Sequence, residues 1–215
     1  MALTIRRADP GASDIRPIVA AHLAHSRATT PQTSCHTMTV DEMTADTVLM
    51  FWAVHDGTRA VGCGALKPLG DGTAEVKSVH VIEDARGRGI ARLLMVHLAD
   101  AARALGHTAL VLETGSERVP GYDAARALYQ RLGYRRCGVL PGYRRDPTAC
   151  SCASTCDFMA SVGKASCARR GRHQRGRHDV QWSPCAVPAP WTCRARRAMK
   201  GQSGPLAQPD RAADF

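Results

Sequence analysis

The sequence predicts an α/β fold over residues 1–162, in which one sheet lies between two layers of helices. Two patterns predict it: short stretches that alternate apolar and polar residues, and longer stretches whose apolar residues recur every three or four positions. These patterns follow one another in the order strand, helix, short helix, three strands, helix, strand, helix, strand. A hydrophobic fraction of 44% supplies enough apolar side chains for a core.

The first segments of the chain predict a strand and two helices. Residues 3–7 alternate apolar and polar side chains, as a half-buried strand does. A helix is expected after Asp14, which is placed to cap it, because the apolar residues that follow have helical spacing. Residues 29–39 lack periodicity and predict a loop, and residues 40–46 predict a short helix.

Three consecutive strands are expected next, at residues 49–54, 59–66 and 73–81. Residues 55–57 read His-Asp-Gly, which is a hairpin signal, and residues 68–72 contain the Pro and Gly of a looser turn. The three strands should therefore form a meander.

The second half of the domain predicts two helices around a buried strand. Residues 89–105 form an amphipathic helical pattern that Gly106 ends. Residues 108–113 are nearly all apolar, as strands in a parallel pairing are. A last helix is expected at residues 123–132, and an extended stretch from Tyr134.

Charge and cysteines divide the chain in two. Residues 1–163 carry 18 basic and 16 acidic residues, whereas residues 164–215 carry 11 and 3, so the net charge of +10 belongs mostly to the tail. Nine cysteines are an odd number, and without a secretion signal they predict reduced thiols. Because no apolar run is long enough to span a bilayer, we expect a cytoplasmic protein.

A glycine-rich turn before the long helix is the strongest chemical signal. Residues 86–91 read Arg-Gly-Arg-Gly-Ile-Ala. The first turn of a helix offers unpaired amides, and the helix dipole favours anions there. Gly87 and Gly89 let the backbone approach a ligand closely, while Arg86 and Arg88 add positive charge. The segment predicts a site for a phosphate-bearing ligand.

This turn is similar to the Gln/Arg-x-x-Gly-x-Gly/Ala motif of the GNAT acetyltransferase superfamily. Residues 123–134 resemble the family segment in which Leu-Tyr precedes a Gly-Phe/Tyr pair. Residues 62–66 and 75–78 resemble a YsnE-like bacterial subgroup, in which a phrase like residues 142–147 precedes the last strand. The resemblance covers about residues 2–162.

The resemblance implies the GNAT fold: a mixed, mostly antiparallel sheet with a splayed parallel pair and helices on both faces. It implies acetyl-CoA as co-substrate and no metal. Backbone amides of residues 86–91 would hold the pyrophosphate, and the backbone of residues 79–81 would pair with the pantetheine arm. The implied coenzyme-binding residues are Val79, His80, Val81, Arg86, Gly87, Arg88, Gly89, Ile90 and Ala91.

The resemblance also implies two catalytic roles. Tyr129 would donate a proton to the departing thiolate, because a phenol with an ordinary pKa near ~10 is protonated at neutral pH. Packing against the sheet is the alternative role for this ring. Glu75, early on the central strand, is the first candidate for the base that deprotonates the amine. His80 and Glu113 are the alternatives, although a packed histidine and a strand-end glutamate explain them equally.

The loop at residues 31–36 lies where this superfamily shapes its acceptor pocket, so Ser34 and His36 are expected to contact the acceptor. Cys35 beside His36 also suggests a nucleophile pair, but neighbours on an extended chain point to opposite sides. The acceptor would be a primary amine of a small molecule or peptide. The sequence leaves the oligomeric state open, a homodimer included.

Residues 163–215 predict a low-order tail, because a segment rich in Arg and Pro buries too little apolar surface to offset its ordering entropy. Three hypotheses compete: a nucleic-acid-binding appendage, a zinc site, and a frameshift or read-through product. We favour the third, since the final family strand looks scrambled over residues 148–162, where residues 156–162 would supply a substitute. The zinc site would draw on Cys150, Cys152, Cys156, Cys167, His173, His178, Cys185 and Cys193.

The sequence therefore predicts an acetyl-CoA-dependent N-acetyltransferase that transfers acetyl directly to an amine in a ternary complex. A non-catalytic acyl-CoA-binding or regulatory module on the same fold is the alternative. Nucleic-acid binding rests on the tail alone, and no membrane partner is expected.

Overall fold

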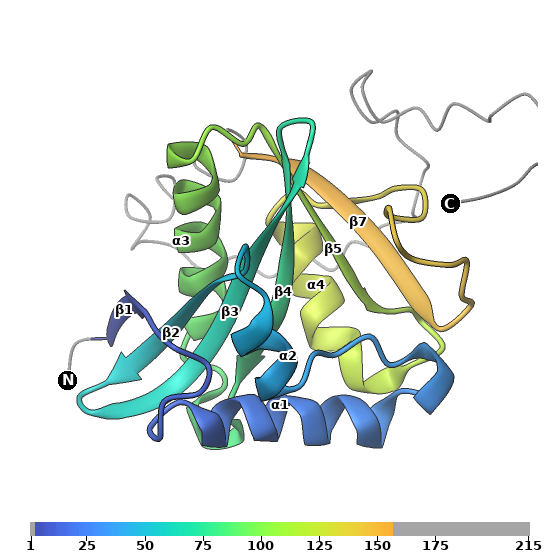
Figure 1. Cartoon of the computed structure of the whole chain (residues 1–215). Coiled ribbons are helices and arrows are strands. Elements are labelled where there is room, and N and C mark those ends of the chain that lie inside the picture. Colours follow the sequence, from blue (N-terminus) through green and yellow to red (C-terminus); the bar gives the residue numbers. More distant parts are fainter. Residues whose placement is uncertain (1–2, 157–215) are drawn as a thin grey trace, which may run out of the picture.

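A seven-stranded mixed sheet organises the chain (Figure 1). The computed structural model describes residues 3–156. The expected domain boundary near residue 162 and the tail at residues 163–215 therefore lie outside the described residues.

All neighbouring strands are antiparallel except β4 and β5. In sheet order the strands are β1 (Leu3–Arg7), β2 (Met50–Asp56), β3 (Arg59–Gly70), β4 (Thr73–Val81), β5 (Ala109–Gly115), β7 (Ala149–Thr155) and β6 (Arg135–Arg136). The helices are α1 (Arg16–Thr29), α2 (Val40–Ala45), α3 (Ile90–Ala104) and α4 (Asp123–Arg131), with short 3-10 turns η1 (Gln32–Ser34), η2 (Glu83–Ala85) and η3 (Pro120–Tyr122). The expected mixed sheet with one parallel pair is confirmed.

Helices cover both faces of the sheet, as expected. Helices α3 and α4 pack on one face through the largest cluster of buried apolar side chains, in which Leu94 and Leu98 of α3 are wholly buried. Helices α1 and α2 pack on the other face, where Ile18 and Met43 cluster with Phe51 of β2. Each helix contributes one apolar stripe, so the core forms as two layers on either side of the sheet.

The parallel pair β4 and β5 is joined only at one end. Residues 73–75 pair with residues 109–111, and no further pairing between the two strands occurs in the described chain. Figure 1 shows the strands close together at this end and apart at the other. Ser78 of β4 has a left-handed φ of 56°, and the register between β3 and β4 shifts beside it. The strands therefore splay as the resemblance implied.

The last long strand is intact, which corrects the expectation that residues 148–162 had lost it. β7 pairs antiparallel with β5 at all seven of its residues. Its small side chains suffice because the ladder is made by backbone hydrogen bonds, while Cys150 and Cys152 are buried in the main core. The substitute strand proposed at residues 156–162 lies outside the described residues beyond its first residue.

Asp14 does not cap the first helix, which is a second correction. α1 begins at Arg16, and its N-cap, Ile15, makes no side-chain hydrogen bond; Pro17 in the first turn presets the helical backbone. The Asp14 carboxylate lies instead 3.7 Å from Nε2 of His55 on β2. A contact with the sheet has replaced the local cap.

Other elements keep the expected order with changed ends. β3 continues through Pro68 to Gly70, so the turn to β4 is tighter than the expected loop at residues 68–72. The extended stretch from Tyr134 contains only the two residues of β6 before a long loop. α2 carries a capping box, in which Thr39 and Glu42 exchange hydrogen bonds.

Leu94 provides a test of the main core, with Leu93 as a matched control on the same helix. Leu94 is 0% exposed and Leu93 is 42% exposed. Leu94→Ala should lower the free energy of unfolding by about 2–5 kcal/mol, because it leaves a cavity. Leu93→Ala should change it by less than about 0.5 kcal/mol. Urea denaturation of both variants checks this, and equal losses would contradict the packing described.

Candidate active site

The parting strands β4 and β5 open onto a cavity of about 130 Å³. Both strands line it, together with α1, the segment around η1, α4 and the loop between β6 and β7. Its walls include Ser34, His36, Glu75, Lys77, Glu113, Tyr129 and Tyr143. The fold therefore brings together the predicted acid, two of the three predicted bases and both predicted acceptor contacts.

Glu75 is tied into a polar cluster at this cavity. Its Oε1 accepts hydrogen bonds from Lys77 Nζ at 3.0 Å and from the Tyr143 hydroxyl at 2.5 Å. The Lys77 ammonium also donates to the Tyr143 oxygen at 2.6 Å. Burial, with help from the Glu75 carboxylate, raises the pKa of Tyr143 above its ordinary value, so the phenol stays a donor. Oε1 of Glu75 is therefore occupied by two donors in the described chain.

Glu113 of β5 faces the same cavity with fewer partners. Burial first, and then the charge of Glu75, raise the pKa of Glu113 to about 7. Within residues 3–156 its one salt-bridge contact is to Nε2 of His36, at 3.9 Å. A carboxyl group with a pKa near the working pH accepts and releases a proton readily.

Tyr129 reaches the cavity from the other face of the sheet. Its ring packs in the main core, 5.7 Å from the ring of Tyr134, and the residue is 9% exposed. Its hydroxyl makes no hydrogen bond within the described chain, and burial raises its pKa well above the ordinary value. Packing and proton donation are thus compatible roles, because the buried phenol stays protonated beside the cavity.

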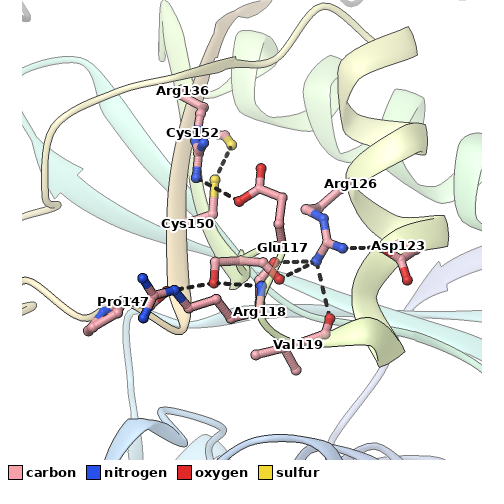
Figure 2. A network of polar contacts seen from close by, with 11 residues as sticks. Glu117, Arg118, Val119, Asp123, Arg126, Arg136, Pro147, Cys150 and Cys152 are labelled. Carbon is pink, nitrogen blue, oxygen red and sulfur yellow. Dashed lines mark hydrogen bonds and ion pairs between the residues drawn. The ribbon is translucent and has the colours of Figure 1, made fainter. Parts of the chain in front are cut away.

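One arginine fixes the loop that leads to Tyr129 (Figure 2). The Arg126 guanidinium donates to the carbonyl of Ser116 at 2.6 Å and pairs with Asp123. The Ser116 amide donates to the carbonyl of Thr148 at 2.7 Å. The end of β5, the start of α4 and the segment before β7 are therefore held as one unit.

A glycine at the end of β5 lets Tyr122 close over the strand. A Cβ atom at Gly115 would overlap the Tyr122 ring, so no larger residue fits without displacing it. The Tyr122 hydroxyl lies 3.2 Å from the Thr30 hydroxyl and 3.4 Å from that of Ser26. These contacts link the start of α4 to α1 along the cavity wall.

The glycine-rich turn offers free backbone donors at the start of α3. The helix begins at Ile90, and its N-cap, Gly89, has a left-handed φ of 77°. In the described chain the amides of residues 87–91 donate no hydrogen bond, whereas the Arg86 amide donates to the Glu83 carbonyl at 3.1 Å. Five of the six expected amides are available to an anion, and that of Arg86 is not.

The two arginines of this turn have partners of their own. Arg88 forms an ion pair with Asp56 of β2 at 2.8 Å, and Nε of Arg86 donates to the carbonyl of Val81 at 3.1 Å. Asp56 therefore offsets the charge of Arg88, whereas the charge of Arg86 adds to that of the backbone amides and the helix dipole at the turn.

The expected pantetheine strand has a free edge. Beyond residue 75, the edge of β4 toward β5 has no ladder pairing in the described chain, although the carbonyl of Val81 accepts a hydrogen bond from Nε of Arg86. The His80 ring packs 5.3 Å and 6.0 Å from the rings of His22 and His25. Burial lowers the pKa of His80 to about 4, so this ring is a neutral packed histidine at pH 7.

The loop that was expected to contact the acceptor lines the first cavity. Ser34 and His36 both line the cavity, as does Cys35 between them. The His36 ring meets the Tyr143 ring edge-on at 5.2 Å, and a hydrogen bond from the Ser34 side chain helps to lower the pKa of Asp146. The loop around η1 and the loop between β6 and β7 therefore face each other across the cavity.

Sequence reasoning gave no role to three wall residues, Lys77, Tyr143 and Tyr122. The first two lie inside segments that carried the family resemblance, which was the one signal that could have marked them. Their contacts join residues up to 96 positions apart, as that of Tyr122 with Ser26 does.

Residues 3–156 contain neither a candidate metal site nor a candidate membrane-spanning helix. No group of three or more His, Cys, Asp or Glu side chains there could hold a metal ion. No helix in that part of the chain is both long and apolar enough to cross a membrane. The later ligands of the hypothetical zinc site lie outside the described residues.

Comparison with known proteins gives consistent matches. The model of the acetyltransferase (GNAT) family matches residues 21–134. The chain is 33% identical over 144 residues to the uncharacterized N-acetyltransferase YedL of Escherichia coli K12, covering 67% of this chain and 89% of YedL. It is 30% identical over 132 residues to the uncharacterized N-acetyltransferase YsnE of Bacillus subtilis 168, covering 61% and 85%.

Solved structures share the fold. An N-acetyltransferase from Staphylococcus aureus Mu50 superposes with a TM-score of 0.56 at 22% identity, over 73% of this chain and 99% of that one. At this identity the match concerns the fold alone.

The raised pKa of Glu113 predicts a pH-dependent difference in stability. Because the folded protein holds this proton up to about pH 7 and the unfolded chain releases it near 4.5, ionising Glu113 destabilises the fold as pH rises through this window. The Glu113→Gln variant lacks that loss. The free energy of unfolding of the variant, relative to that of wild type, should therefore increase from pH 5 to pH 8. Denaturant titrations at several pH values check this. The same substitution at exposed Glu83 should show no such trend, and a trend of opposite sign at Glu113 would contradict the assignment.

Proposed function

We propose, because this chain belongs to the acetyltransferase (GNAT) family, that it transfers acetyl from acetyl-CoA to a primary amine of a small molecule or peptide. The family makes the chain an acyltransferase with an acyl-CoA co-substrate and an amine acceptor. The acetyl donor, the acceptor class and the mechanism are the proposal.

The splay of β4 and β5 is the observation that carries it. A parallel ladder that stops after residues 75 and 111 leaves strand edges with unpaired amides and carbonyls beside the cavity of Tyr129 and Glu113. Such edges need a partner, and the amide-bearing pantetheine arm of a coenzyme can supply it. The thioester would then enter the cavity between the two strands.

The turn before α3 fits the diphosphate of that coenzyme. Free amides at residues 87–91, and Gly87 and Gly89 with open space where a Cβ would be, allow close approach of an anion. Bound acetyl-CoA supplies an activated thioester carbonyl, and every other element of catalysis belongs to the chain.

We assign the general base to Glu113 rather than to Glu75. Two donors, from Lys77 and Tyr143, occupy Oε1 of Glu75, whereas Glu113 has a pKa of about 7, and its one salt-bridge contact within residues 3–156 is to His36 at 3.9 Å. Glu113 would take a proton from the ammonium form of the acceptor, directly or through water. Lys77 and Tyr143 would then position Glu75 and set the field around Glu113.

Tyr129 is the proposed general acid. The amine nitrogen would bond to the thioester carbon to give a tetrahedral intermediate. The carbon–sulfur bond would then break, and the leaving thiolate would take the proton of the Tyr129 hydroxyl, while the second proton that the amine nitrogen loses as the amide forms would return through solvent to the Tyr129 phenolate. The buried phenol is protonated before this step and has no competing hydrogen bond in the described chain. Much of the rate would come from aligning amine and thioester in one cavity.

Titration calorimetry with acetyl-CoA, followed by a thiol-release assay over an amine panel, tests the whole proposal. Binding with release of coenzyme A thiol in the presence of an amine is expected. Binding without release from any amine would favour a non-catalytic acyl-CoA-binding module.

Tyr129→Phe separates catalysis from coenzyme binding. Removing the proposed acid should lower kcat by about 10²-fold, the usual size of a general-acid contribution, and leave the acetyl-CoA dissociation constant within about twofold. Steady-state kinetics and calorimetry check the two effects. Equal losses in both would show that the ring packs rather than donates.

The pH dependence of kcat/KM should identify the base. The wild-type value should fall below about pH 7 as Glu113 becomes protonated. Glu113→Gln should abolish this step and lower the plateau by about 10²-fold. Glu75→Gln should keep the step but move its midpoint lower, because the charge of Glu75 helps to raise the pKa of Glu113. Loss of the step in the Glu75 variant alone would return the role to Glu75.

A further inference from the structure

A second cavity adjoins the first one. Its volume is about 190 Å³, and Glu113 and Ala149 line both cavities. The rest of its wall comes from the start of β7, from β6 and from the loop between these strands. A molecule with its amine at Glu113 could therefore extend from one cavity into the other.

Three arginines line the second cavity: Arg136, Arg144 and Arg145. Arg136 is engaged, since its guanidinium pairs with Glu117 at 3.1 Å beside Cys150 (Figure 2).

Arg144 and Arg145, unlike Arg136, have no acidic side chain within ion-pair distance in residues 3–156. Both residues are exposed. Asp146, which also lines the cavity, accepts hydrogen bonds at 2.7 Å from both the amide and the hydroxyl of Thr148. Two guanidiniums thus stand at the cavity with no acidic partner in the described chain.

We propose that the acceptor is a primary amine that also carries an acidic group, with the amine at Glu113 and the acidic group at Arg144 and Arg145. A guanidinium offers paired N–H donors that match a carboxylate or a phosphate. The proposal rests on the proposed function and names the acceptor class for it.

The coenzyme does not account for these arginines. Its phosphates are assigned to residues 87–91 at the start of α3, and neither α3 nor that turn lines the second cavity. Substituting Arg144 and Arg145 should therefore leave acetyl-CoA affinity unchanged.

The test compares matched amines by equilibrium binding to the full chain saturated with coenzyme A. One series contains ω-amino carboxylic acids of two to five methylene groups, the second their carboxamides, and the third aminoalkyl phosphates. At least one acid should bind tenfold or more tightly than its uncharged counterpart. The relative affinities of the carboxylates and phosphates identify which acidic group is preferred.

The double variant Arg144→Gln/Arg145→Gln should weaken binding of the preferred acid by about 10- to 100-fold. Binding of the uncharged carboxamide should stay unchanged, which shows that the variant is folded. Arg16→Gln/Arg131→Gln, two exposed arginines that line neither cavity, is the control with the same change in net charge and should keep the preference for acids.

Three results would overturn the proposal: equal binding of acids and carboxamides, an equal loss in the control variant, or a fall in coenzyme affinity in the Arg144/Arg145 variant. A thiol-release assay on the same amines separates it from the proposed function. Selective binding of acids without turnover of any amine would remove the proposed function and leave the anion site standing.

Discussion

The end of the parallel ladder between β4 and β5 is the constraint on which the rest of the site depends. After residues 75 and 111 the two strands diverge, and the backbone groups along the edge of β4 lose their partners. Unpaired backbone groups beside a core are costly, so the gap must face solvent or a ligand. The left-handed φ of Ser78 and the register shift beside it turn β4 away from β5. The same gap gives Tyr129, which packs on the far face, access to the cavity.

Two carboxylates in one small cavity acquire different properties because their neighbours differ. One oxygen of Glu75 accepts hydrogen bonds from Lys77 and Tyr143. Glu113 is desolvated without such donors and also meets the charge of Glu75, and both effects raise its pKa to about 7. The charge of Glu75, which Lys77 and Tyr143 hold in place, therefore helps to raise the pKa of Glu113. Neither residue can be understood alone, and a substitution at one changes the other.

The loop between β6 and β7 does more than its irregular sequence suggested. It supplies Tyr143 to the first cavity and Arg144 to the second, and its end is tied to β5 through Ser116. These side chains take up different surroundings because successive residues of a loop point in different directions. The expected loss of the last strand was wrong, because backbone pairing with β5 tolerates the small side chains of β7.

The sequence alone determined the order of helices and strands, the amphipathic α3 and the glycine-rich turn before it, because periodicity and backbone freedom are local properties. Through resemblance it also pointed to Tyr129, Ser34 and His36, and to Glu75 ahead of Glu113 as the base. Our proposal of Glu113 as the base rests instead on tertiary contacts, those of Lys77 and Tyr143 with Glu75. Tertiary structure likewise decided that Asp14 meets His55 instead of capping α1, and that Arg88 is neutralised by Asp56. Contacts between distant residues set these energies, and no local pattern encodes them.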